Sequence, residues 1–162
     1  MKTLKYPHKS LTTPTVEITD FGMDIARIGN EMLSHMKAEN GLGLAANQVG
    51  INLRLFVTTS PNDIGKWPDS IVCNPKWKPT PSGFEYARVE GCLSFPGWLL
   101  PIKRYDAIIA EYDTALGDKR KIILHGLAAQ VFQHETEHLN GELFTKHLTS
   151  AQQQTLRNFY KE

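Results

Sequence analysis

Residues 134–138 read HETEH, with two histidines four positions apart and a glutamate directly after the first. An α-helix turns once per 3.6 residues, so these histidines lie on one face and can bind one metal ion. Leu127 and Val131 continue that face toward the N-terminus, which indicates that it points into the interior. The pattern therefore predicts a buried metal, with Glu135 placed to act on a water molecule beside it. The alternative is a chance arrangement on a solvated helix.

Catalytic zinc-type sites take three protein ligands and leave one position open, so a third ligand is required. The metzincin protease pattern would place a histidine at position 144, where this chain has phenylalanine. We expect His147 to be a surface residue, because a helix that ends at Asn140-Gly141 carries it away from the first two histidines. Glu142 is expected to be solvated. The third ligand is therefore sought upstream.

Two cysteines lie upstream of the predicted helix. Cys92, in the segment EGCLS (90–94), offers a thiolate, which is a strong ligand for divalent metals. Taken alone it could equally be a small core residue, which is the role we expect for Cys73. The segment GLGLAANQVG (41–50) is either a loop built around a ligand or a glycine-rich turn after a helix. It lacks the glycine spacing and the lysine-serine pair of phosphate-binding loops.

Three segments together resemble the peptide deformylase family. The chain has GLGLAANQ (41–48), EGCLS (90–94) and QHETEH (133–138), in the order and spacing of that family's motifs. Those motifs read Gly-x-Gly-x-Ala-Ala-x-Gln, Glu-Gly-Cys-Leu-Ser and Gln-His-Glu-x-Asp-His. The likeness extends to further positions outside the motifs: Pro7, Leu11, Pro14, Val16 and the Asn74-Pro75 pair.

The resemblance implies one divalent metal ion held by Cys92, His134 and His138, with water as the fourth ligand. It implies that Glu135 is the general base of a hydrolase that removes the formyl group from N-terminal formylmethionine of new polypeptides, releasing formate. The family usually works with iron(II), which we therefore expect in the cell. Zinc, nickel and cobalt also suit a Cys-His-His set.

The resemblance also assigns groups that contact the substrate. The Gln48 amide and the Leu93 backbone N–H are expected to stabilise the oxyanion formed during attack. Backbone groups of Leu42, Gly43 and Gly91 are expected to pair with the substrate main chain. Apolar side chains near the site, such as Leu127 and Val131, would line a pocket for the methionine side chain. Packing in the protein core is an equal alternative for both residues.

The chain departs from the family pattern at a few positions. Glu137 replaces an aspartate, keeps its charge and is not expected to be a ligand. Gln130 stands at a position that is commonly apolar in the family, and Leu99 at one that is arginine in many bacterial members. Both changes affect the expected preference for substrate side chains, not the reaction. Many members carry a longer basic C-terminal helix that docks on the ribosome, whereas this chain stops soon after Arg157. We therefore expect ribosome association to be weak and transient.

Composition fits a single catalytic domain over residues 1–162. Hydrophobic residues make up 41% and charged residues 22%, which disfavours disorder, and no apolar run reaches the ~20 residues needed to span a bilayer. The net charge of +1 offers no basic field for nucleic acid. The N-terminus MKTLKYPHKS has no apolar core typical of a secretory signal. We expect a cytoplasmic monomer with reduced cysteines and neither a nucleic-acid nor a membrane partner.

The periodicity predicts an α+β fold, with mixed and antiparallel strands packed around the central helix that carries the metal motif. Helices are expected over 20–37, with Asp20 as N-cap, over 124–139, and after Ser150. Residues 60–69 are expected to form a surface loop. The expected strands are 53–58, 71–74, 84–89 and 107–112, with 119–124 as the hairpin partner of the last.

Two other functions are consistent with these residues. One is a zinc peptidase or amidase with the same ligands and a different acyl substrate. The other is a metal-dependent binding protein without catalysis. Glu135 disfavours the second, because a purely structural site normally closes its fourth position with a protein ligand.

Overall fold

The structure, a computed structural model, describes residues 1–59 and 67–160. Three α-helices, seven strands and short 3-10 turns make up the described chain. The helices are α1 (Met23–Ala38), α2 (Gly126–Leu139) and α3 (Ser150–Phe159). The strands are β1 (Gly43–Ala45), β2 (Leu55–Thr58), β3 (Ser70–Pro79), β4 (Glu85–Cys92), β5 (Phe95–Tyr105), β6 (Ala107–Asp113) and β7 (Lys119–His125).

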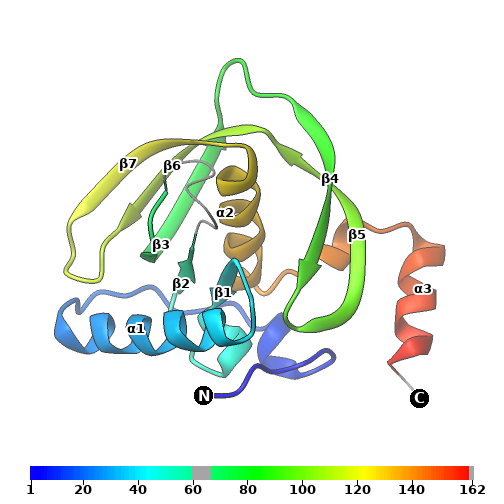
Figure 1. Cartoon of the computed structure of the whole chain (residues 1–162), viewed down its shortest axis with the longest axis horizontal. Helices are drawn as coiled ribbons and strands as arrows, with labels where there is room; N and C mark the ends of the chain where they lie inside the picture. The colour runs from blue at the N-terminus through cyan, green and yellow to red at the C-terminus, as the bar shows by residue number, and fades with distance from the viewer. Residues whose placement is uncertain (60–66, 161–162) are drawn as a thin grey trace.

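The strands form two antiparallel sheets around α2. Five of them pair in the order β1-β2-β3-β6-β7, and β4 and β5 form a separate two-stranded sheet. Figure 1 shows α2 between these two sheets, with α1 along one side and α3 beyond β5. The expected α+β fold with a central metal-motif helix is confirmed. Within the described residues, parallel pairing is limited to a single bridge between Val16 and Leu53.

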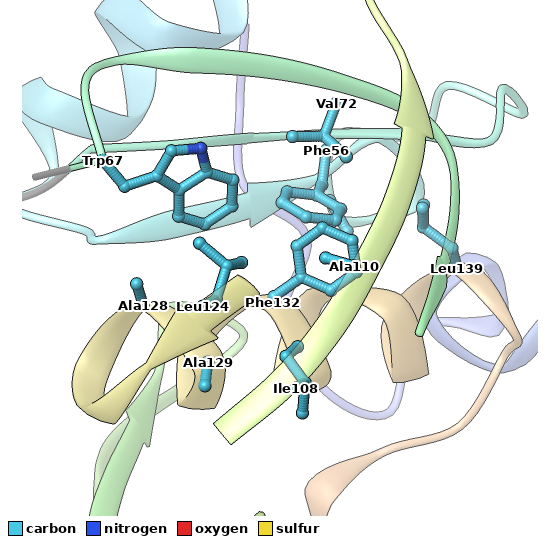
Figure 2. Close-up of a cluster of buried hydrophobic side chains, with 11 residues drawn as sticks. Phe56, Trp67, Val72, Ile108, Ala110, Leu124, Ala128, Ala129, Phe132 and Leu139 are labelled. Atoms are coloured by element: carbon cyan, nitrogen blue, oxygen red, sulfur yellow. The ribbon is translucent and has the colours of Figure 1, made fainter. Parts of the chain in front are cut away.

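Helix α2 is buried on almost every side, so its apolar residues are not confined to one face of the helix. Its small and apolar residues pack on the five-stranded sheet, where Phe132 meets Phe56 edge to face at 5.2 Å between ring centroids. Figure 2 shows this cluster, with Trp67 and Val72 above the helix. The polar residues of the metal motif lie on another face. The helix thus fixes the motif on a rigid, packed support.

Helix α1 lies where a helix was predicted, over 20–37, but it begins later than predicted. Ile25, Met32 and Met36 are buried against β1 and β2. The N-cap is Gly22 rather than Asp20. Gly22 has φ 137° and ψ −156°, a backbone conformation that residues other than glycine rarely adopt. The cap therefore lies at this glycine, two residues later than predicted.

Other boundaries differ from prediction by a few residues. The predicted strand 53–58 begins at Leu55, and 71–74 falls in the first half of the longer β3. The strand 84–89 runs on to Cys92, while 107–112 and 119–124 pair as predicted and each extends by one residue. The metal helix begins at Gly126, because residue 124 still belongs to β7.

Strands β1 and β5 were not predicted. The 11 residues of β5 contain Pro96, Gly97 and Pro101, which are residue types typical of loops. The prolines are tolerated because, in the described part of the chain, β5 pairs with β4 alone, so its second edge needs no N–H donor. The predicted loop at 60–69 lies mainly outside the described residues, although Trp67 is buried.

The C-terminal helix has its cap one residue before the predicted one. The Thr149 hydroxyl accepts a hydrogen bond from the Gln152 N–H, and the Gln152 side chain reaches back to the Thr149 N–H. Leu156 is buried against the cluster around Phe95, and Phe159 is exposed. Across the described ranges, no helix combines the length and apolar character needed to cross a membrane.

Candidate metal centre

Cys92, His134 and His138 converge at one point between β4 and α2. One ligand atom from each lies within 4.8 Å of the other two. The Cys92 Sγ is 3.2 Å from the His138 Nε2, and the two imidazole rings have centroids 4.9 Å apart. The predicted ligand set is therefore a spatial cluster, and the i, i+4 spacing brings the imidazoles together as expected.

A bulge at the end of β4 positions the thiol. The pairing of β4 with β5 shifts register between Gly91 and Cys92, so that Cys92 pairs with Phe95 across a tight turn. A bulge adds local twist and changes the direction of the following side chain. Figure 1 shows this end of the β4–β5 hairpin beside α2. A residue from a strand thereby joins two residues from the helix.

A carboxylate behind His134 orients its ring. The Glu90 Oε2 is 2.9 Å from the His134 Nδ1, so the opposite nitrogen, Nε2, faces the cluster. Arg104 donates two hydrogen bonds to Glu90, at 2.8 and 3.0 Å. Burial would raise the pKa of Glu90, but hydrogen bonds from His134 and Arg104 outweigh it and lower the pKa to about 2. An ionised Glu90 is the usual kind of partner for a metal-binding histidine.

The buried ion pair continues to Glu137. The Arg104 Nη1 lies 2.6 Å from the Glu137 Oε1, which also contacts Lys146 and His147. Glu137 therefore links α2 to β5, and the cluster of candidate ligand atoms consists of Cys92, His134 and His138. His147 is exposed and away from the cluster, and so is Glu142, which pairs with Lys146.

Glu135 is 4% exposed and lines the cavity beside the cluster. Among the described residues its Oε2 has no hydrogen-bond partner, which leaves that oxygen available to a substrate or water. Gly43 permits this position, since a Cβ there would overlap the carboxyl group, 2.7 Å from its Cδ. Burial raises the pKa of Glu135 to about 7. A carboxyl group in this state can both accept and release a proton near neutral pH.

The Gln48 side chain has a defined orientation. Its Oε1 accepts a hydrogen bond of 2.8 Å from the Ala45 N–H. Its Nε2 therefore faces the site, 3.5 Å from the Cys92 Sγ and 3.0 Å from the Ser94 Oγ. Gln48 is 1% exposed, and both it and Leu93 line the cavity. Two groups expected to stabilise an oxyanion thus lie beside the metal cluster.

The cavity at this site has a volume of about 760 Å³ and is mostly apolar. Its walls come from the segment before and within β1, from β4 and β5, and from α2. They include all five residues expected near the substrate: Leu42, Gly43, Gly91, Leu127 and Val131. Among the described strands, β1 pairs with β2 alone, so its other edge can accept a further strand.

The donor set fits a divalent transition metal. It offers one sulfur and two imidazole nitrogens, which is three ligands of the type found in catalytic sites with an open position. Burial lowers the pKa of His138 well below its usual range, which favours the neutral imidazole that binds metals. Burial also acts to lower the pKa of His134, but hydrogen bonds with Cys92 and Glu90 outweigh burial and raise that pKa above its usual value. The negative groups that favour a proton there also favour a metal cation.

Comparisons with known proteins agree with this site. Residues 1–154 match the sequence model of polypeptide deformylases. The chain belongs to the polypeptide deformylase family. It is a metal-dependent enzyme that hydrolyses the N-formyl group of nascent peptides. The rival functions, a different amidase and a non-catalytic binding protein, are not supported.

Individual deformylases align over most or all of the chain. Peptide deformylase 2 of Streptomyces avermitilis is 38% identical over 83% of this chain and 72% of its own length. A peptide deformylase of Helicobacter pylori is 32% identical over the whole chain and 94% of its own length. The crystal structure of the Ehrlichia chaffeensis deformylase superposes with a TM-score of 0.90, at 29% identity, over 99% of this chain and 94% of that one.

Sequence reasoning missed the residues behind the ligands. Arg104 had no predicted role, and Glu90 appeared only as part of a motif. Ser94, which accepts a hydrogen bond from Gln48, was likewise not singled out. A buried glutamate requires a partner for its charge, but the sequence does not mark Glu90 as buried, because β4 also carries Glu85 and Arg88. Nothing local to the sequence points to Arg104 as that partner.

Proposed function

We propose that Cys92, His134 and His138 hold the single divalent metal of this deformylase and that hydrolysis takes place in the cavity beside them. The observation that carries the proposal is the convergence of three ligand atoms with Glu135 and Gln48 at one cavity wall. When bound, the metal would supply Lewis-acid chemistry and lower the pKa of water toward neutrality. Iron(II) is the ion we propose in the cell, and zinc, nickel or cobalt would fit the same ligands.

Glu135 is the proposed proton carrier. Its Oε2, which has no hydrogen-bond partner among the described residues, lies at the cavity wall and can accept the proton that water loses as its oxygen attacks the formyl carbon. The same proton then passes to the leaving nitrogen as the carbon–nitrogen bond breaks, which yields formate and a free N-terminal amine. One carboxyl group can therefore serve both halves of the reaction without a second acid.

The Gln48 amide and the Leu93 backbone N–H are the proposed donors to the oxyanion. The bond from Ala45 holds the Gln48 amide with its N–H groups toward the site before substrate arrives. Donors positioned in advance need no rearrangement during the reaction. Replacing one such donor typically lowers the rate constant by about 10²–10³.

We propose that the substrate main chain adds as a strand between β1 and β4. Gly43 in β1 and Leu42 directly before it line one wall of the cavity, and β4 offers Gly91 on the opposite wall. The side chain of formylmethionine would then extend toward Leu127 and Val131. This arrangement places the formyl group beside the ligand cluster.

We propose one catalytic domain over residues 1–162 that acts as a monomer on N-formylmethionyl peptides in the cytoplasm. Both cysteines are free thiols, which suits a reducing compartment. The described part of α3 has Arg157 as the basic residue of its last turn, so contact with the ribosome would be weak and transient.

The test is formate release from a formyl-methionyl tripeptide by anaerobically purified, iron-loaded protein. Glu135→Ala and Cys92→Ser should both abolish release, whereas Glu142→Ala, a matched change in an exposed glutamate, should leave it intact. Metal content separates the two roles, because only Cys92→Ser should lose the ion. Equal activity in Glu135→Ala and wild type would overturn the proposed proton carrier. Loss of activity in air should follow from oxidation at the iron–thiolate site.

A further inference from the structure

Gln130 is a buried amide in a cavity that is otherwise largely apolar. It lies on α2, is 6% exposed and belongs to the cavity wall. Apolar residues of the same wall include Leu127 and Val131, which are close to Gln130 along α2, and Val89, whose carbonyl oxygen Gln130 contacts. Burying an amide among such side chains costs free energy unless its hydrogen-bonding groups find partners.

Most of the hydrogen-bonding capacity of the Gln130 amide is not taken up by other described residues of the protein. Over residues 1–59 and 67–160, its one hydrogen bond runs from Nε2 to the Val89 carbonyl oxygen, at the limiting distance of 3.5 Å. A glutamine amide has two N–H donors and an oxygen with two lone pairs. Gln130 therefore retains donor capacity inside the substrate cavity.

The position of Gln130 relative to the metal cluster defines what it can reach. It precedes the ligand His134 by four residues, so both lie on one face of α2 about one helical turn, or about 6 Å, apart. With the formyl group at the cluster, the first side chain of the substrate starts two bonds away and extends along this wall. The end of an unbranched side chain of methionine's length would approach Gln130.

Methionine itself does not satisfy this amide, because a thioether sulfur is a weak hydrogen-bond acceptor. Oxidation converts methionine to its sulfoxide, which has a polar S=O group at the same place along the chain. An S=O group in a fully apolar pocket would be buried without a partner, whereas an amide N–H in reach can donate to it.

We propose that Gln130 enables this deformylase to act on peptides that begin with N-formylmethionine sulfoxide as well as on those that begin with N-formylmethionine. The Gln130 Nε2 donates to the sulfoxide oxygen. The bond cleaved and the products are otherwise those of the ordinary reaction. This inference rests on the proposed function, since it requires the formyl group to be bound at Cys92, His134 and His138.

The experiment compares kcat/KM for formyl-Met-Ala-Ser and the same tripeptide with methionine sulfoxide, using each sulfoxide epimer separately. Wild type, Gln130→Leu and Gln130→Met are assayed beside Gln154→Leu, which replaces an exposed glutamine on α3. In both Gln130 variants the ratio of sulfoxide to methionine activity should fall about tenfold, the effect of leaving one buried polar group unpaired. In Gln154→Leu the ratio should match wild type.

The epimers provide a second readout. Because Gln130 approaches from one wall, wild type should favour one epimer, and that preference should vanish in Gln130→Leu. A ratio that stays within twofold of wild type in both Gln130 variants would overturn the inference and leave Gln130 as a packing residue that bonds to Val89. Absence of formate release from formyl-Met-Ala-Ser by wild type would instead contradict the proposed function itself.

Discussion

Cys73 is fully buried beneath α1, whereas Cys92 lies at the cavity wall, partly accessible. Burial raises the pKa of the Cys73 thiol to about 12, and the nearby Asp113 charge adds to the effect. Thiol reagents attack the thiolate, so Cys73 is protected both by its position and by its protonation. Cys92 would be protected only while it binds a metal.

A thiol titration at pH 8 tests this difference. Metal-free native protein should react at one thiol per chain, zinc-loaded protein at none, and denatured protein at two. Cys92→Ser should remove the native reaction altogether. Two reactive thiols in the native metal-free state would show that Cys73 is not enclosed as the structure has it.

Gly43 faces Glu135 so closely that a methyl group has no space. Gly43→Ala should displace the Glu135 carboxyl and lower kcat by at least about tenfold, because small displacements of a catalytic group are costly. Metal content should remain stoichiometric, since no ligand is touched. Gly97→Ala is the matched control for the assay, because nothing lies within 4 Å of a Cβ there, although its positive φ of 81° adds backbone strain. Unchanged kcat in Gly43→Ala would contradict the placement of Glu135.

The β4–β5 hairpin and α2 are joined by buried charges rather than by apolar packing alone. Glu90 on β4, Arg104 on β5 and Glu137 on α2 form one connected set, with the Arg104 and Glu90 side chains each 3% exposed. A buried pair contributes little net stability over an apolar pair, but removing one partner leaves uncompensated charge. Arg104 therefore acts at the level of elements, since it holds a strand carrying one ligand against a helix carrying two.

Arg104→Met should lower the free energy of unfolding by about 3–5 kcal/mol. Apparent metal affinity should fall about 10- to 100-fold, because His134 loses its orienting partner chain. Urea denaturation measures the first effect and metal competition with a chelator the second. Arg27→Met, which breaks exposed pairs on α1, should change stability by less than about 1 kcal/mol. Similar losses in the two variants would contradict the importance of the buried set.

The molecule as a whole brings the proposed metal ligands together from a strand and a helix. The proposed ligands Cys92, on β4, and His134 and His138, on α2, would connect the β4–β5 hairpin to the central helix through the metal. A metal that binds the folded chain and not the unfolded one stabilises the entire domain by mass action. Metal binding should thus be visible in global unfolding.

Zinc at 100 times its dissociation constant should add about 2.7 kcal/mol to the free energy of unfolding. For a chain of this size that corresponds to a rise in Tm of roughly 5–10 °C. Scanning calorimetry with and without zinc measures the shift, and Cys92→Ser should show a much smaller one. An equal shift in that variant would place the stabilising ion elsewhere.

Much of the metal centre was predictable from sequence because its signals are local. Two proposed ligands and Glu135 follow from the period of one helix, and the motif around Cys92 supplied the third proposed ligand through the family resemblance. The five-stranded sheet was largely predictable where a run of β-branched residues lies next to a turn signal, as in β6 and β7. Strand β5 was hidden by its prolines, which only an unpaired edge makes acceptable.

The sequence alone was enough to predict the central helix and the class of reaction, and to propose the ligand set that the structure brings into one cluster. Only the tertiary structure decided that Glu90 and Arg104 stand behind His134, that Gly43 makes room for Glu135, and that Gln130 lies within the substrate cavity. The Glu90–His134 contact joins residues 44 positions apart. Such contacts depend on how strands and helix pack in space, and no periodicity within a single segment encodes them.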